Sequence, residues 1–264
     1  MKHRISVARW IVLGLMLLPQ PALAAFHIMD IDQVIGGVGG DTTAQAVQLR
    51  MRQTLQNNLH GLGALRVYDA AGLNPVVLTI FPMPPPNPAS GSCTPILIST
   101  AAFNAKTNPA TVPDYAMDNP IPPAYLAAGS LAFESLSGSP PTTYWRVTWG
   151  DGGYTGSQGV AGAVNFTSTS ASPAFGSALP SSGTQALKFT PAACPLGTNN
   201  AADYAVTAGA AVFNNNTGAG GGSFTVQLPP PPVPGLPGIS RYLLPGILGL
   251  GVLAFAIQRR RRSV

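Results

Sequence analysis

Short clusters of apolar and β-branched residues, separated by Gly, Pro and Asn every few positions, run through the middle of this chain. The 264 residues include 30 Gly and 27 Pro. Both residue types disfavour helix interiors and mark turns. Helical spacing is confined to 54–62 and 119–128, each long enough for a turn or two. We therefore predict an all-β domain.

Strands are predicted where apolar and polar residues alternate, or where β-branched and aromatic residues cluster. The turn-rich segments Gly36 to Asp41 and Asp69 to Gly72 each join two such runs, and the second makes a hairpin-like unit. This pattern favours a single β-sandwich, with a barrel as the alternative. The predicted strands are 26–35, 44–51, 63–68, 76–81, 95–99, 130–134, 143–149, 185–190, 205–212 and 223–228.

The formal charge of +5 belongs to the two ends of the chain. Between residues 25 and 240, six basic residues stand against nine acidic ones, so this part is mildly acidic. Nucleic-acid binding depends on a basic surface that contacts phosphates. We therefore expect no nucleic-acid partner.

The first 24 residues have the layout of a secretory signal peptide. Basic residues at positions 2, 4 and 9 precede the apolar run 10–18, which is too short to span a bilayer. Ala22, Ala24 and Ala25 form a small-residue cleavage site, so we expect cleavage after Ala24 or Ala25. The chain is predicted to be exported.

The other end of the chain is predicted to meet the membrane. A Pro-rich linker at 229–238 follows the predicted ectodomain (25–228), and residues 239–264 supply an apolar helix and the basic tail Arg259, Arg260, Arg261 and Arg262. Arginines of this kind stay cytoplasmic, which would leave the ectodomain outside. The apolar run 242–257 makes about 24 Å of helix, short of a hydrocarbon core of about 30 Å. Both a temporary hold before cleavage and a permanent anchor remain open.

The chain has two cysteines, Cys93 and Cys194, both in the predicted ectodomain. An oxidising compartment permits a disulfide between them. Closing a loop of roughly 100 residues would contribute about 4–5 kcal/mol in the chain-entropy account. We expect the bond, with two unpaired thiols as the alternative.

Few residues in the predicted ectodomain suit catalysis. It has two histidines, His27 and His60, and one glutamate, Glu134. A nucleophile elbow of the form G-x-S-x-G is absent from the sequence. We expect no catalytic residue, no metal site and no cofactor.

Two residue pairs invite a choice between a binding and a structural role. Asp30 and Asp32 share one face of a predicted strand, so they are either solvated carboxylates or a cation site completed by Asp69 or Asp151. Trp145 and Trp149 also share a face. Buried, they belong to the sandwich core, and exposed, they would form a ligand face that stacks on sugar rings. We expect solvated carboxylates and core tryptophans.

The predicted ectodomain resembles the lamin-tail-like family, which consists of immunoglobulin-like β-sandwiches in bacterial secreted proteins. The resemblance is one of strand pattern over about residues 26–215, and it includes a strand followed by an Asp-x-x-Gly turn. It implies an Ig-like fold and an extracellular setting, and it brings no catalytic residues. The segments that carry it are 28–34, 45–50, 65–72, 96–103, 127–133 and 147–150.

The C-terminus resembles the PEP-CTERM class of sorting signals, which are processed in the envelopes of exopolysaccharide-producing bacteria. The similarity lies in a proline motif, here Val233, Pro234 and Pro237, followed by an apolar helix and an arginine cluster. The chain departs from the class because it has no Pro-Glu-Pro. The resemblance implies a sorting transpeptidase or protease as a partner, and the departure leaves that processing open.

Together these features predict a non-enzymatic exported protein of the cell surface or exopolysaccharide matrix, with a structural or adhesive role. Expected partners are the membrane, through the C-terminal helix, and extracellular polysaccharide. One alternative is a carbohydrate-binding module that uses Trp145 and Trp149. Another is a secreted hydrolase with an unrecognised site.

Overall fold

A computed structural model describes residues 27–82, 91–150, 152–156, 174–191, 200–216 and 222–228. The predicted signal peptide, the Pro-rich linker, the C-terminal helix and Cys194 lie outside these residues. Among the residues it does describe, no helix is long and apolar enough to cross a membrane.

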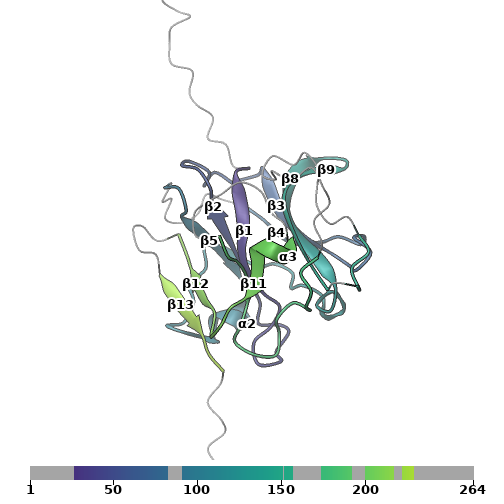
Figure 1. The fold of residues 1–264 in the computed structure, drawn as a ribbon. Coiled ribbons are helices and arrows are strands. Elements are labelled where there is room, and N and C mark those ends of the chain that lie inside the picture. The colour runs from purple at the N-terminus through teal and green to yellow at the C-terminus, as the bar shows by residue number, and fades with distance from the viewer. Residues whose placement is uncertain are drawn as a thin grey trace, which may run out of the picture. The chain divides into compact units, whose positions relative to one another are not determined.

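Strands dominate the described part of the chain and form three sheets. The largest sheet has six strands in the order β11-β10-β1-β2-β5-β7 (Figure 1). All neighbours in it are antiparallel except β5 and β7, which are parallel. The strands are β1 (Met29–Ile35), β2 (Ala46–Met51), β5 (Pro95–Ser99), β7 (Tyr115–Ala116), β10 (Leu187–Phe189) and β11 (Tyr204–Val206).

The second sheet has four antiparallel strands in the order β4-β3-β8-β9. They are β3 (Gly63–Tyr68), β4 (Val76–Ile80), β8 (Gly129–Gly138) and β9 (Pro141–Trp149). The predicted hairpin at 63–81 is confirmed. Its turn is held by the Asp69 carboxylate, which accepts hydrogen bonds from the Ala71 and Leu73 amides, both at 2.9 Å.

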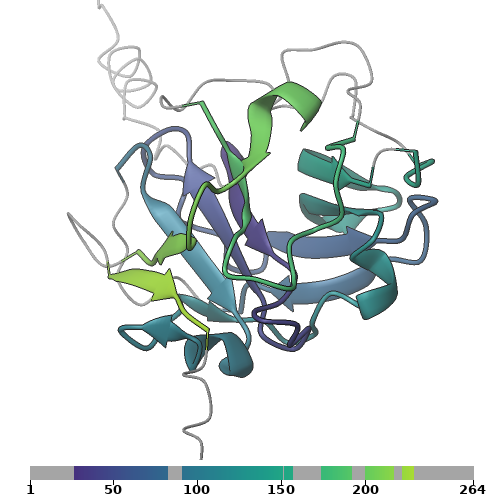
Figure 2. The ribbon, with the colours of Figure 1, turned by 60° about the horizontal axis from the view of Figure 1, so that its bottom comes forward.

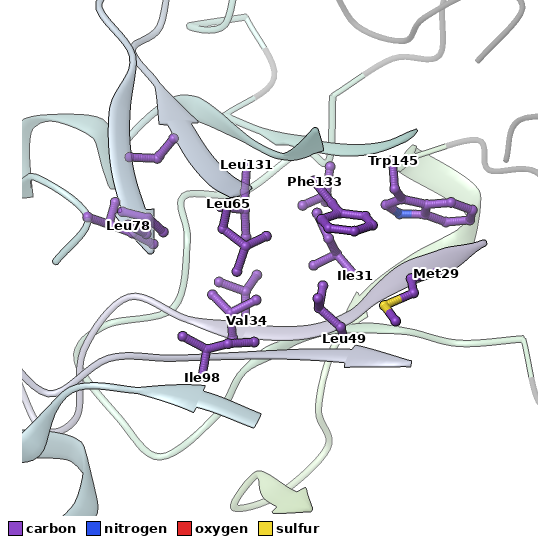
Figure 3. Close-up of a cluster of buried hydrophobic side chains, with 14 of the residues drawn as sticks. Met29, Ile31, Val34, Leu49, Leu65, Leu78, Ile98, Leu131, Phe133 and Trp145 are labelled. Carbon is purple, nitrogen blue, oxygen red and sulfur yellow. The ribbon is translucent and has the colours of Figure 1, made fainter. Parts of the chain in front are cut away.

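The main core lies between these two sheets (Figure 3). The alternation of strand residues explains it, because every second residue of a strand points to the same side. Thus Met29 and Ile31 of β1 face Phe133 and Trp145 of the other sheet, and all four are 0% exposed. No ladder joins the two sheets within the described residues, so the all-β sandwich is confirmed and the barrel alternative is not.

A third, smaller sheet covers the other face of the six-stranded sheet (Figure 2). It has the order β12-β13-β6, from β12 (Val212–Asn214), β13 (Ser223–Val226) and β6 (Thr107–Asn108). Phe213 packs edge-on against Phe103 at 5.2 Å between ring centroids, within a second core that contains Leu97 of β5. The six-stranded sheet is therefore covered on both faces here.

Helices are few and short in the described residues. They are α2 (Ala101–Asn104), α3 (Asn200–Asp203) and one 3₁₀ turn (Pro123–Tyr125). Of the helical turn expected within 119–128, the structure has only that 3₁₀ turn. The helical turn expected at 54–62 is wrong, because that segment consists of loop and turn. The single strand predicted at 205–212 is also wrong, because it divides into β11 and β12, which belong to different sheets.

Candidate functional site

Trp145 and Trp149 lie in the main core, and both are 0% exposed. The Trp145 indole N–H donates to the Tyr204 hydroxyl at 2.8 Å, and the Trp149 indole N–H donates to the Tyr125 carbonyl at 2.9 Å. The core interpretation is confirmed. The alternative of an exposed ligand face is wrong, because the side of β9 that carries both indoles faces the six-stranded sheet.

Asp30 and Asp32 do not point into the main core, but they are not solvated. Their exposed fractions are 0% and 4%, so the expectation of two solvated carboxylates is wrong. Arg50 of the neighbouring strand reaches both: its Nη2 lies 3.1 Å from Asp30 Oδ2 and its Nη1 3.4 Å from Asp32 Oδ1. We call Asp30, Asp32 and Arg50 the aspartate cluster.

The third sheet accounts for part of this burial. The Gln48 side chain donates to Asp32 Oδ2 at 2.6 Å and accepts from the Asn214 amide of β12, also at 2.6 Å. A β-bulge between Ile31 and Gln33 leaves Asp32 as the extra residue of β1. Neither the bulge nor the covering strand has a local signature in the sequence.

Burial changes the acidity of the cluster. Removal from water raises the pKa of Asp30 to about 7, and Arg50 opposes this rise only in part. Burial likewise raises the pKa of Asp32, against the opposing charges of Arg50 and Lys188. A cation site is not favoured here, since Arg50 already occupies the space between the carboxylates. Asp69 holds its own turn, and Asp151 lies outside the described residues.

A second buried cluster lies on the outer face of the four-stranded sheet, around Glu134. Its Oε2 accepts from Tyr68 Oη at 2.7 Å and Arg66 Nη1 at 3.1 Å, and its Oε1 accepts from Thr143 Oγ1 at 2.9 Å and Arg146 Nη2 at 3.3 Å. The Glu134 side chain is 1% exposed. We call these five residues the glutamate cluster.

The glutamate cluster has a structural geometry. Both carboxylate oxygens already accept two hydrogen bonds, and the side chain is closed to solvent, so Glu134 is poorly placed as a general acid or base. The Arg146 guanidinium also stacks on the Tyr68 ring, with its Cζ 5.0 Å from the centroid. Sequence reasoning identified Glu134 as a candidate but missed its four donors.

The two histidines occupy different surroundings. His27 packs against Tyr144, with 5.6 Å between ring centroids, and His60 is exposed in a turn. The described side chains that donate to Glu134 and to the two aspartates are those of arginine, glutamine, tyrosine and threonine. In the described ranges, no group of three or more His, Cys, Asp or Glu residues is arranged to hold a metal ion.

Comparison with known proteins gives no relative. No family model matches the chain, no curated protein matches it, and no solved structure matches it.

The surface of the described domain carries very little charge. Of its charged side chains, Asp118 and Lys188 are exposed, and Asp41, Asp69, Lys106 and Asp203 are half-buried. The others are buried or half-buried, chiefly in the aspartate and glutamate clusters, and Lys106 and Asp41 form a further pair at 3.6 Å. Asp30 and Asp32 were expected to be solvated because the sequence does not show that the outer face of their strand is closed.

Several predicted positions lie outside the described residues. Cys93 is in the turn before β5, but Cys194 is not described, so their bond remains a prediction. The other undescribed positions are the cleavage residues Ala22, Ala24 and Ala25, the motif residues Val233, Pro234 and Pro237, and the basic tail Arg259 to Arg262.

Proposed function

We propose that this chain is an exported, non-enzymatic module of the cell surface or exopolysaccharide matrix, with a structural or adhesive role. In this proposal the sandwich is of the Ig-like, lamin-tail-like type. A signal peptide directs export, and the C-terminal segment holds the protein at the membrane until it is sorted or retains it there. A Cys93–Cys194 disulfide stabilises the ectodomain outside the cell.

The observation that carries the proposal is the unequal distribution of charge in the described domain. Catalysis would require ionisable groups at an accessible surface. In this domain, several of these groups instead form buried ion pairs within the sheets. The exposed positions are mostly small or polar residues without charge, and a few larger apolar side chains, such as Leu73 and Val112, are exposed as well. Such a surface suits close packing among hydrated polymers, where a charged surface would bind ions and counter-charged chains instead.

Intact-mass spectrometry of the mature protein, recovered from the cells that make it, tests the sorting part. We expect an N-terminus at residue 25 or 26 and a C-terminus between about Gly235 and Ser240 if a sorting enzyme acts, or at Val264 if the helix is a permanent anchor. Reduction should raise the mass by about two daltons if the disulfide is present. A mass that retains residues 1–24 would contradict export.

Extraction of the matrix fraction tests the structural role. Because the described surface is nearly uncharged, we expect the protein to stay with that fraction in about 1 M NaCl, where the screening length falls to about 3 Å. Release by salt would contradict the proposal, because it would show ionic attachment. A variant with Arg259 to Arg262 replaced by Ser is the control, since it alters membrane retention and leaves the ectodomain surface intact.

A further inference from the structure

The aspartate cluster contains two buried carboxylates and a single guanidinium in contact with them. Arg50 is placed between the carboxylates and bonds Asp30 Oδ2 through both Nε, at 3.3 Å, and Nη2, at 3.1 Å. Asp30 Oδ1 is buried and receives no hydrogen bond from the described residues. A buried anionic oxygen without a donor is costly, and a proton on the carboxyl group removes that cost.

The neighbouring groups do not supply the missing donor. The Tyr204 hydroxyl donates to the Ile31 carbonyl at 2.6 Å, so its proton is already used. Arg52 stacks on Trp145, with its Cζ 5.1 Å from the ring centroid. Lys188, on β10, is exposed, and water screens its charge.

The charged and titratable groups that face the pair come from three directions. On the β2 side are Arg50, whose charge favours ionisation of both carboxyl groups, and Arg52, whose charge favours ionisation of Asp30. On the β10 side is Lys188, and on β11 is Tyr204. The negative charge of Asp32 also opposes the ionisation of Asp30 through like-charge repulsion.

We propose that Asp30 and Asp32 form a proton-storing pair in the folded domain, so that acidification from pH 8 to pH 5 adds a proton to the pair and stabilises the fold. The proton comes from solvent and is carried by the Asp30 carboxyl group. This inference concerns the folded domain alone and does not depend on the proposed function. Proton uptake by the pair therefore makes the folded domain more stable in acidic surroundings.

The direction follows from the acidity of Asp30 in the two states. Its pKa is about 7 when folded and 3.8 when unfolded, so the folded domain holds more protons between these values. The stabilisation is fully present below the unfolded pKa and is lost as the pH rises through 7. From pH 8 to pH 5, these pKa values predict an increase in the folding equilibrium constant on the order of 100-fold, about 2.7 kcal/mol at 1.36 kcal/mol per decade.

The experiment is chemical denaturation of the full chain in a non-ionic detergent, followed by tryptophan fluorescence at several pH values. Wild type should gain on the order of 100-fold in the folding constant at the lower pH. Asp30→Asn should lose most of that gain, since it can no longer bind the proton. Asp118→Asn, which removes an exposed carboxylate, is the matched control and should behave as wild type.

Asp114 contributes in the same direction, because burial raises its pKa to about 6. The decisive quantity is therefore the difference in pH dependence between wild type and Asp30→Asn. A wild-type folding constant that is unchanged or smaller at pH 5 would overturn the proposal. So would an Asp30→Asn variant that keeps the full dependence.

A second measurement keeps the proposal testable if Asp30→Asn fails to fold. Carboxyl carbon NMR of wild type labelled at aspartate should show one carboxyl group with a midpoint near 7. Asp32→Asn should move that midpoint downward, because it removes a neighbouring like charge. If every aspartate carboxyl group titrates below pH 5, the pair stores no proton and the proposal fails.

Discussion

Replacing Glu134 with glutamine should be among the most destabilising single changes on the outer face of the four-stranded sheet. The substitution keeps the shape of the side chain but removes its charge and turns one acceptor oxygen into a donor NH2 group. Two arginines, whose side chains are only 14% and 10% exposed, then lose their counter-ion. Breaking a buried ion pair from one side costs about 3–5 kcal/mol. The slight exposure of both arginines places Glu134→Gln near 3 kcal/mol.

Chemical denaturation at pH 7, followed by the fluorescence of the buried tryptophans, measures this cost. Thr143→Val is the matched comparison, since it removes one hydrogen bond to the same carboxylate and should cost only about 1 kcal/mol. The cost of Glu134→Gln should change little with salt, because buried pairs are weakly screened. A cost below about 1 kcal/mol, or one abolished by salt, would refute the reasoning and show that the cluster behaves as a solvated surface pair.

Three further predictions concern other parts of the fold; all use the same denaturation assay, and the last also uses NMR. Gly150→Ala should lower the free energy of unfolding by more than 2 kcal/mol, and Gly152→Ala by about 1 kcal/mol. Both glycines have a positive φ, but only at Gly150 would the new Cβ lie 2.5 Å from a backbone oxygen. Equal losses for the two variants would contradict this reasoning. Tyr204→Phe removes a partner from a buried indole N–H and a β1 carbonyl, and should cost roughly 2–3 kcal/mol; a loss under 0.5 kcal/mol would be inconsistent with that bonding. Replacing the whole cluster, Asp30 with leucine, Arg50 with methionine and Asp32 with asparagine, should change stability by less than about 2 kcal/mol but broaden amide NMR signals, because no buried charge is left without its partner. Sharp, wild-type-like spectra would argue against a role in specifying register.

The pairing of neighbouring strands could be predicted from the sequence. Alternation in 26–35 and 44–51, with a glycine-rich turn between them, anticipated the antiparallel β1–β2 pair. The Asp69 to Gly72 turn anticipated β3–β4 in the same way. These signals are local, because a turn and two alternating segments suffice to specify a hairpin.

The third sheet and both charged clusters could not be predicted from local signals. The strands β6, β12 and β13 have two to four residues each, and β6 lies about 100 residues before the other two in the sequence. Alternation divides a strand into two faces, but it does not say whether the second face meets water or another sheet. Asp30 and Asp32 were therefore expected to be solvated, whereas long-range packing encloses them.

The clusters have a physical role beyond their energy, which is modest for buried ion pairs. Strands rich in small and similar residues specify their register weakly, and a slip by one residue exchanges the two faces of a strand. Asp30 lies directly opposite Arg50 in the β1–β2 ladder, and Glu134 of β8 lies diagonally between Arg66 of β3 and Arg146 of β9. A shift of either strand pair by one residue would turn a charged side chain toward the apolar core, where it would have no ion-pair partner. The charges of the two clusters are therefore placed where they exclude wrong pairings of the strands.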